Sequence, residues 1–596
     1  MSLDVFFNDE SPLINLIPDF KFRKYQRDLS LFIKESIDNY CTSVVEAPTG
    51  SGKTLAYLIP SFLSNKKIII STKSKQLMNQ LFFKDIKVLK ELNICDRKVS
   101  ILKGKKNYFC IYRFYKYILP FQEEYQDVIK WYSKNDEKDI LEVPYYLFDE
   151  SVYDKMTADS FQCLAGKCEY YERCHYYKAK DIANASDIVI TNHYLLLTDI
   201  ASKSKSGFLS NFENFEHIIF DEAHSIIDIF PMFAGEEVSV NNLKSFLKDC
   251  KTSIRAELYT EITNKIRLFE TKIKVKKTLN DKHMEAFEQI IDFIRGNILE
   301  MLDDEDIESF KKIEKSYKYI LEHEGVKVIE PTKQSVLIKL LPLKVDDIFY
   351  NGLLNTCISA TFISATLTSD KSFEFFKKEL GLPLNTSEYI VDKDNFKKNS
   401  VYVIPKKIED KKKFYIEAVK SIDAPMLLIF NSINMMNIIY DELSQHVTNK
   451  NILLQHSVNM GEFFADSKDV ILGCAVLREG IDIKTNSRLK CVIIDKLPFE
   501  NISDVYLEMK ANEVQASGKN PFMDFYLPRA VIFFKQAIGR LIRSEEDNGL
   551  CIILDERILN KSYGKYFLEE IDENRIYHSV ADALNALEEI NDQSKT

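Results

Sequence analysis

The sequence predicts an α/β protein with two lobes, and three short motifs carry that prediction. Ala-Pro-Thr-Gly-Ser-Gly-Lys-Thr occupies residues 47–54, between a β-branched pair and an apolar stretch with helical spacing. Asp-Glu-Ala-His at 221–224 directly follows the apolar stretch 217–220, and Gln-Ala-Ile-Gly-Arg-Leu-Ile-Arg occupies 536–543. The first motif has a strand–loop–helix context, and the second directly follows a stretch that is typical of a buried strand. The third lies more than 300 residues further along the chain, and we place it in a second lobe.

The first motif is typical of a phosphate-binding loop. Glycine at positions 50 and 52 lets the backbone turn tightly, so that several N–H groups point at one anion. Lys53 adds a positive charge for the β- and γ-phosphates, and Thr54 offers a hydroxyl to Mg²⁺. We therefore expect a nucleoside triphosphate to contact Thr49, Gly50, Ser51, Gly52, Lys53 and Thr54.

The other two motifs indicate what is done to the triphosphate. Asp221 at the end of a strand can hold Mg²⁺ through water, and Glu222 can orient the attacking water as a general base. Arg540 and Arg543 share one helical face because they lie three residues apart. Arginines in this position suit a developing phosphate charge on the far side of a cleft. The sequence thus predicts ATP and Mg²⁺ as cofactors, with hydrolysis between the lobes.

The composition of the chain argues against a membrane protein and against an indiscriminate polyanion-binding protein. The chain has 596 residues, of which 45% are hydrophobic, and no run approaches 18 apolar residues. We therefore expect no membrane segment and a cytoplasmic protein. A net charge of −10 argues against indiscriminate binding to polyanions. A nucleic-acid site would have to be a local basic groove, with candidate stretches at 103–106, 272–277 and 406–413.

Four of the eleven cysteines suggest a metal centre. Cys110 precedes the other three, and Cys163, Cys168 and Cys174 follow within twelve residues. On spacing alone the metal is either zinc, with His175 replacing one cysteine, or an iron–sulfur cluster. No Cys-x-x-Cys pair is present among them, which disfavours a zinc ribbon.

Further motifs resemble those of the DinG/YoaA branch of the XPD-like superfamily 2 DNA helicases, over nearly the whole chain. The matching segments are 22–26 (the adenine-reading glutamine), 71–81 (the grip on the DNA backbone), 102–110 and 174–197 (the borders of the iron–sulfur domain), 364–367 (Ser-Ala-Thr-Leu) and 478–482 (Arg-Glu-Gly-Ile-Asp). Only about twenty residues precede the glutamine segment, so we expect no N-terminal exonuclease domain.

The resemblance assigns roles to individual residues. Gln26 would read adenine, Gln536 would act in hydrolysis, and Gly480 and Asp482 would touch the nucleotide. A 4Fe–4S cluster would be held by Cys110, Cys163, Cys168 and Cys174, and DNA would be contacted by Thr72, Lys73, Gln76 and Lys105.

The resemblance also implies the organisation of the chain, which is two RecA-like motor domains with an inserted iron–sulfur domain and a mostly helical arch domain. Motor lobe one takes residues 1–105, 179–235 and 335–394, and motor lobe two takes 395–596. The iron–sulfur segment is 106–178 and the arch is 236–334, where apolar residues recur at helical spacing. The sheet of lobe one is expected to resume at about residue 335.

The expected function is that of an ATP-dependent 5′→3′ DNA helicase, which moves on single-stranded DNA and unwinds duplex or repair and replication intermediates. The resemblance implies a monomer that binds single-stranded DNA and duplex junctions, with a replication or single-strand-binding protein as partner. The alternative is an ATPase stimulated by nucleic acid that acts mainly on RNA or RNA–DNA hybrids.

Overall fold

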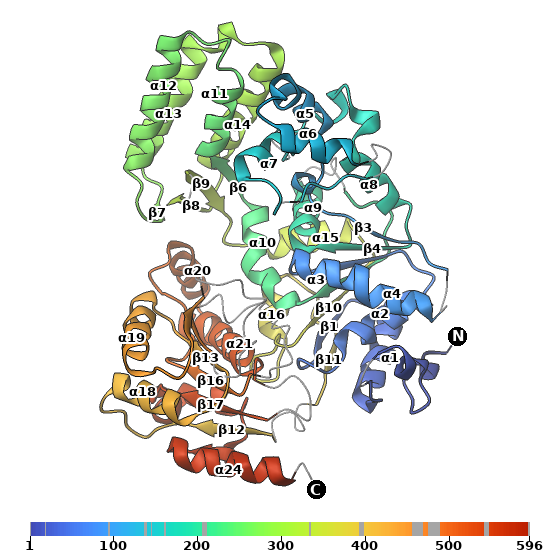
Figure 1. The fold of residues 1–596 in the computed structure, drawn as a ribbon, viewed down its shortest axis with the longest axis vertical. Helices are drawn as coiled ribbons and strands as arrows, with labels where there is room; N and C mark the ends of the chain where they lie inside the picture. Colours follow the sequence, from blue (N-terminus) through green and yellow to red (C-terminus); the bar gives the residue numbers. More distant parts are fainter. Residues whose placement is uncertain are drawn as a thin grey trace.

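The computed structural model contains two parallel sheets, one in each lobe, and a smaller antiparallel sheet (Figure 1). The residues that the structure describes are 2–17, 20–92, 96–135, 140–144, 146–159, 162–205, 211–332, 335–392, 399–455, 469–474, 489–541 and 548–593. Within these ranges, no helix is long and apolar enough to cross a membrane. The predicted fold class, α/β with two RecA-like lobes, is confirmed.

The sheet of lobe one is parallel throughout its described part. Its order is β11 (Ser387–Ile390), β1 (Ser43–Glu46), β10 (Ser359–Ser364), β5 (His217–Asp221), β2 (Ile68–Thr72), β4 (Ile188–Asn192) and β3 (Val99–Ile101). The central strands are fully buried, as expected of a sheet covered on both faces.

Helices cover both faces of this sheet. One face carries α1 (Lys24–Asp38), α2 (Lys53–Leu63), α3 (Lys75–Gln80) and α4 (Ile86–Glu91). The other carries α8 (His175–Asn184), α9 (His193–Lys205), α10 (Ile226–Ala234), α15 (Asp346–Leu354) and α16 (Glu374–Glu379). A π-helical turn, Leu81–Asp85, joins α3 to α4.

Lobe two repeats this three-layer arrangement. Its parallel sheet has the order β14 (Ile452–Leu454), β15 (Val470–Gly473), β13 (Met426–Ile429), β16 (Cys491–Ile494), β17 (Gly549–Ile553), β12 (Ser400–Val403) and β18 (Ile576–Tyr577). One face carries α18 (Lys411–Ser421), α19 (Ile433–His446) and α24 (Val580–Gln593). The other carries α21 (Leu527–Ile538), α22 (Arg557–Asn560) and α23 (Lys565–Leu568), and α20 (Val505–Ala516) lies beside them.

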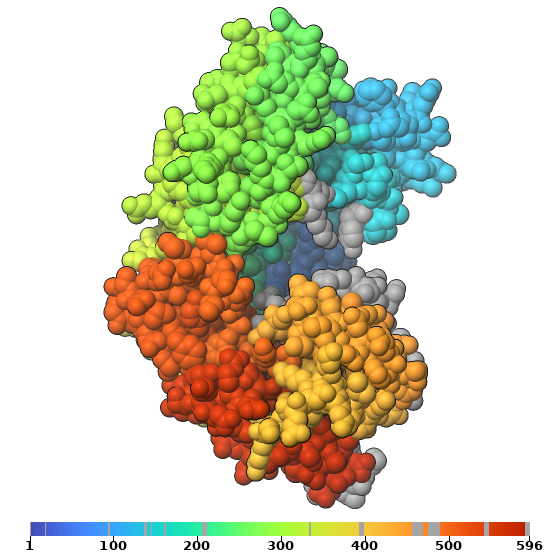
Figure 2. All heavy atoms as spheres, turned by 90° about the vertical axis from the view of Figure 1, so that its left-hand side faces the viewer, coloured from blue at the N-terminus to red at the C-terminus, as the bar shows by residue number. Residues whose placement is uncertain are grey.

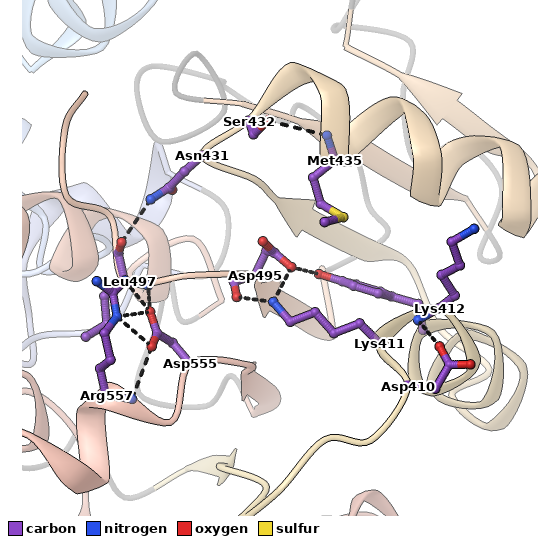
Figure 3. Close-up of polar contacts among 11 residues, drawn as sticks. Asp410, Lys411, Lys412, Asn431, Ser432, Met435, Asp495, Leu497, Asp555 and Arg557 are labelled. Atoms are coloured by element: carbon purple, nitrogen blue, oxygen red, sulfur yellow. Dashed lines mark hydrogen bonds and ion pairs between the residues drawn. The ribbon is translucent and has the colours of Figure 1, made fainter. Parts of the chain in front are cut away.

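Buried carboxylates fix the loops of lobe two where its strands end (Figure 3). Asp495, just after β16, accepts hydrogen bonds from the Lys411 ammonium at 2.8 Å and the Tyr415 hydroxyl at 3.2 Å. Asp555, just after β17, accepts from the backbone N–H of Leu497 and pairs with Arg557 at 2.7 Å. These bonds tie the ends of β16 and β17 to α18 and α22, so the loops that face lobe one start from fixed points.

The segment 106–178 forms a small unit above lobe one. It contains α5 (Ile111–Tyr117), α6 (Gln126–Ser133) and α7 (Glu150–Met156), packed on a largely aromatic core that includes Phe109 and Phe114.

The arch combines four helices with a sheet that the sequence did not predict. The helices are α11 (Val240–Asp249), α12 (Ala256–Thr271), α13 (Asp281–Asn297) and α14 (Asp304–Glu322). The antiparallel sheet has the order β6 (Glu236–Ser239), β9 (Val336–Leu341), β8 (Val326–Pro331) and β7 (Lys277–Thr278). The expectation that the sheet of lobe one resumes at about residue 335 is therefore wrong. Strand β9 forms a hairpin with β8, and the first sheet resumes only at β10.

The arch also touches lobe two. Tyr506 of α20 packs with Val505 against the arch sheet, and its hydroxyl donates to the backbone oxygen of Pro342 at 3.3 Å. Lys276, directly before the edge strand β7 of the arch sheet, forms an ion pair with Asp504 at 2.8 Å. In Figure 2 the green arch adjoins the orange part of lobe two, and a hollow separates the light-blue segment from the yellow part.

Candidate functional site

The predicted phosphate loop lies where β1 meets α2. Gly50 and Gly52 adopt φ values of 76° and 77°, in the left-handed region that glycine enters without steric cost. The Lys53 ammonium donates to the backbone oxygens of Ala47 and Pro48 at 3.1 and 3.3 Å, so it lies over the loop. This conformation gathers the backbone and the lysine around one position.

Gln26 supports the loop from helix α1. It is buried, and its amide donates to the backbone oxygen of Gly52 at 3.0 Å. A Cβ atom on residue 52 would lie only 2.0 Å from that amide nitrogen. The close approach requires glycine here and places the predicted adenine-reading residue directly against the phosphate loop.

The two candidate Mg²⁺ ligands meet at a tyrosine. The hydroxyl of the buried Tyr57 lies 3.1 Å from the Asp221 carboxylate and also interacts with the Thr54 hydroxyl. Burial and the Asp221 charge raise the Tyr57 pKa far above its ordinary value, so the hydroxyl stays protonated and donates. Thr54 and Asp221 are thereby brought together, as an Mg²⁺ site requires.

Glu222 is held by a hydrogen-bonded triangle. Its carboxylate accepts from the Ser364 hydroxyl at 3.2 Å and lies 3.3 Å from Nδ1 of His224, which itself lies 2.8 Å from Ser364. Burial raises the Glu222 pKa, but the bond from His224 and the charge of Lys53 outweigh it and hold the pKa well below its usual range. For Asp221 the balance is reversed, because burial and the adjacent Glu222 charge raise its pKa. Glu222 therefore stays ionised, as a group that orients water by accepting a hydrogen bond must.

Lobe two faces this site through the end of α21. The Thr49 hydroxyl donates to the backbone oxygen of Gly539 at 3.1 Å, which brings the residue before Arg540 into contact with the phosphate loop. Gln536 is buried, and its amide nitrogen lies 3.4 Å from the Thr366 hydroxyl. Its oxygen has no hydrogen-bond partner among the described residues, so it can accept one from a water or a nucleotide. Arg543, Gly480 and Asp482 lie outside the described residues.

A groove of about 1370 Å³ lies between α3 and the segment 106–178. Its lining is basic, aromatic and amide-bearing, and comprises Lys75, Gln76, Asn79, Gln80, Phe83, Lys84, Lys103, Lys106, Asn107, Glu142, Val143, Pro144, Tyr146 and Tyr153. Phe83 and Tyr146 are 64% and 74% exposed, unusually high for aromatic side chains. Burial is the main cause that lowers the Lys75 pKa, and the charges of Lys103 and Lys106 lower it further while that of Glu142 opposes them.

Of the predicted DNA-contacting residues, one lines the groove and the others do not. Gln76 lines the groove, whereas Thr72 is buried and its hydroxyl donates to the Ser74 backbone oxygen. Lys73 is half-buried at the end of β2. Lys105 lies 5.3 Å from the ring of Tyr176, beneath the groove rather than in its lining. The exposed aromatic residues of the groove escaped the sequence analysis, because isolated exposed rings leave no periodic pattern.

The four candidate cysteines lie near one another. Burial raises the pKa of Cys110 to about 11, and the neighbouring Cys174 and Cys168 thiols raise it further, while Cys163 acts in the same direction on Cys168 and Cys174. Among the described residues, no group of three or more His, Cys, Asp or Glu side chains is close enough to hold one metal ion. Thiolates that bind different corners of a cluster lie further apart than the ligands of one ion. His175 accepts a hydrogen bond from the Leu141 N–H, so its Nδ1 already has a structural role.

Known proteins resemble this chain over nearly its full length. Residues 30–168 match the DEAD/DEAH box helicase domain, and residues 415–574 match the helicase C-terminal domain. The ATP-dependent DNA helicase YoaA of Haemophilus influenzae is 28% identical, over 95% of this chain and 96% of its own. The 3′-5′ exonuclease DinG of Bacillus subtilis is 26% identical, over 97% of this chain and 73% of its own.

Solved structures agree with these relatives in fold. An XPD helicase structure superposes with a TM-score of 0.57 at 18% identity, covering 92% of this chain and 98% of its own. The S. tokodaii Xpd4 structure has a TM-score of 0.53 at 14% identity, covering 93% of this chain and 99% of its own. With two RecA-like lobes and a phosphate loop facing the end of α21, the chain contains the domains of a DEAD/DEAH box helicase and is similar to the DinG and YoaA proteins. It is an ATP-hydrolysing enzyme.

Glu222→Gln should separate nucleotide binding from hydrolysis. The amide keeps the size of the side chain but cannot act as a base, so we expect ATP to bind while turnover falls at least about 100-fold. Rapid-quench measurement of phosphate release with single-stranded DNA present tests this. Lys53→Ala is the contrasting variant, because it should weaken nucleotide binding itself. Wild-type turnover by Glu222→Gln would show that another group is the base.

Proposed function

We propose that this enzyme couples ATP hydrolysis to 5′→3′ movement along single-stranded DNA and so separates duplexes at junctions. The substrate is proposed by analogy with the relatives that are named DNA helicases. The groove between α3 and the segment 106–178 is the observation that carries the proposal. Its location beside the phosphate-loop lobe would let a bound strand respond to the nucleotide.

The lining of the groove suits a single strand of any sequence. Lysines along a groove attract phosphates, and exposed aromatic rings stack on bases whatever their identity. Phe83 and Lys84 lie on the π-helical turn Leu81–Asp85, and such turns are frequent at functional sites. On a chain whose net charge is −10, such a basic groove is local and selective for an extended polyanion.

In the proposed cycle, ATP lies between the lobes. Thr54 and Asp221 would hold Mg²⁺, which supplies positive charge to the phosphates, while Glu222 orients the attacking water. Arg540 of lobe two approaches the triphosphate, and the resemblance also assigns Arg543, Gly480 and Asp482, which lie outside the described residues, to the nucleotide. Closure on ATP and opening after hydrolysis move the lobes along the strand.

The four cysteines lie near one another, and with the family resemblance this supports the proposal that together they hold a 4Fe–4S cluster. A bound cluster would connect four separate points of the segment 106–178. This segment and the arch would then stand as a rigid wedge over lobe one. We also propose that the protein acts as a cytoplasmic monomer beside a replication or single-strand-binding protein.

The direction of movement is tested with tailed substrates. We expect strand displacement from a duplex with a 5′ single-stranded tail and little from the same duplex with a 3′ tail. The alternative function, action mainly on RNA or RNA–DNA hybrids, predicts that a 5′-tailed hybrid is unwound much faster than the DNA duplex. Preference for the 3′ tail would contradict the proposed direction.

The groove itself is tested with Phe83→Ala. Loss of one stacking ring should raise the concentration of single-stranded DNA needed for half-maximal ATPase activity by about tenfold. The rate of ATP hydrolysis without DNA should not change. Lys84→Ala should weaken binding and lower the salt dependence by about one unit of slope. Lys90→Ala on α4 is the matched control, since Lys90 is exposed but does not line the groove. Equal effects of all three variants would mean that the strand lies elsewhere.

Cys168→Ser tests the cluster. Anaerobically purified wild-type protein should contain about four irons and four sulfides per chain, and the variant should lose them together with unwinding. DNA-stimulated ATPase should partly survive, because both lobes lie outside the segment. Cys41→Ser, which changes an exposed cysteine far from the other four in the sequence, should retain the iron. Stoichiometric zinc without iron in the wild type would overturn the cluster.

A further inference from the structure

Helix α21 carries a buried lysine that reaches across the cleft between the lobes. The Lys535 ammonium lies 2.8 Å from each carboxylate oxygen of Glu46. It also donates to the backbone oxygen and the hydroxyl of Thr368, at 2.9 and 2.8 Å. Lys535 and Glu46 are 4% and 1% exposed. An ammonium with this many oxygen partners is fully satisfied without water.

Glu46 connects this lysine to two nucleotide motifs of lobe one. It is the last residue of β1, and Ala47 of the phosphate loop follows it. Its carboxylate also accepts the backbone N–H groups of Leu367 and Thr368, at 2.6 and 2.7 Å. Leu367 is the last residue of the Ser-Ala-Thr-Leu motif, and Thr368 directly follows the motif. One carboxylate therefore joins the phosphate loop, the loop after β10 and helix α21.

On the side of lobe two, Lys535 is adjacent to the residues that face the nucleotide. Gln536 is the next residue, and Gly539, at the end of the same helix, contacts Thr49 of the phosphate loop. A second buried cation, Arg529, binds Asp228 of lobe one at 2.7 Å from the start of α21. The two ion pairs hold both ends of the helix, but only that of Lys535 involves the nucleotide motifs.

The ion pair between Lys535 and Glu46 depends on the docking of the lobes. Two buried charges are tolerated in a dry interface because each compensates the other, and separation would leave each to be hydrated on its own surface. The pair thus forms only when α21 lies against β1, which is the arrangement that brings Gln536 and Arg540 toward the phosphate loop.

We infer that Lys535 is a positioning residue for ATP hydrolysis, which fixes α21 against the phosphate loop and the Ser-Ala-Thr-Leu loop through Glu46 and Thr368. Because its ammonium is engaged by Glu46 and Thr368, it acts on the reaction through Gln536 and Arg540. The inference rests on ATP hydrolysis alone and does not depend on which nucleic acid is the substrate or on the direction of movement.

Lys535→Met tests the inference, because methionine keeps the length of the side chain and removes its charge. We expect kcat for ATP to fall about 100-fold, as small displacements of catalytic groups do, while KM for ATP and the Kd of ADP change less than about threefold. The matched control is Lys510→Met. Lys510 is also buried between the lobes, with its ammonium on the Leu343 backbone oxygen and 3.4 Å from Glu379, but it contacts no nucleotide motif. The Lys510→Met variant should have a lower unfolding temperature than the wild type and an unchanged kcat.

The double variant Lys535→Met/Glu46→Gln separates positioning from stability. It removes the Glu46 charge that Lys535→Met alone leaves unpaired, and only Glu570, 3.7 Å from the Lys535 ammonium in the wild type, still lacks its cation. Its unfolding temperature should therefore recover part of the way toward that of the wild type. Its kcat should stay low, because the bonds from α21 to Thr368 are still missing. If Lys535→Met alone does not fold, the kcat of the double variant is compared with that of the wild type instead.

Two outcomes would overturn the inference. One is a double variant whose kcat recovers together with its stability, and the other is equal kcat for Lys535→Met and Lys510→Met. All rates are compared with wild-type hydrolysis in the same buffer without nucleic acid. A wild type that hydrolyses ATP but unwinds no duplex would contradict the proposed function and leave this comparison intact.

Discussion

Parallel pairing of β1, β10 and β5 is the constraint on which the catalytic site depends. In a parallel sheet all strands end at one edge, and here the register sets Glu46 beside Ser364 and Ile363 beside Asp221. The phosphate loop, the Ser-Ala-Thr-Leu loop and the Asp-Glu-Ala-His loop therefore begin at the same edge of three adjacent strands. Contacts as different as the triangle around Glu222 and the ion pair of Glu46 follow from this one alignment.

The sequence was sufficient to predict the parts of this site that are local. A phosphate loop is a contiguous stretch whose glycines, lysine and threonine have fixed spacing, and the strands around it are continuous apolar runs. The fold class followed from the same signals and is confirmed. The roles of the individual site residues remain predictions, and Gly480, Asp482 and Arg543 lie outside the described residues.

Contacts between segments that lie far apart in the chain could not be predicted from the sequence. Lys535 and Glu46 are 489 residues apart, and nothing local to either one distinguishes it from a surface charge. The groove likewise gathers Phe83 and Tyr146 from two separate segments. The arch sheet was missed for a related reason. Strands β8 and β9 are short apolar runs, and without knowledge of their partners they could be assigned to either of two sheets.

The contact of Tyr506 and Val505 with the arch sheet has a mechanical consequence. The arch is rooted in lobe one through α10 and the chain that leads to α15, while its sheet rests on α20 of lobe two. The arch therefore connects the same two lobes that form the nucleotide cleft. If the angle between the lobes changes, either this apolar contact must slide or the arch must tilt.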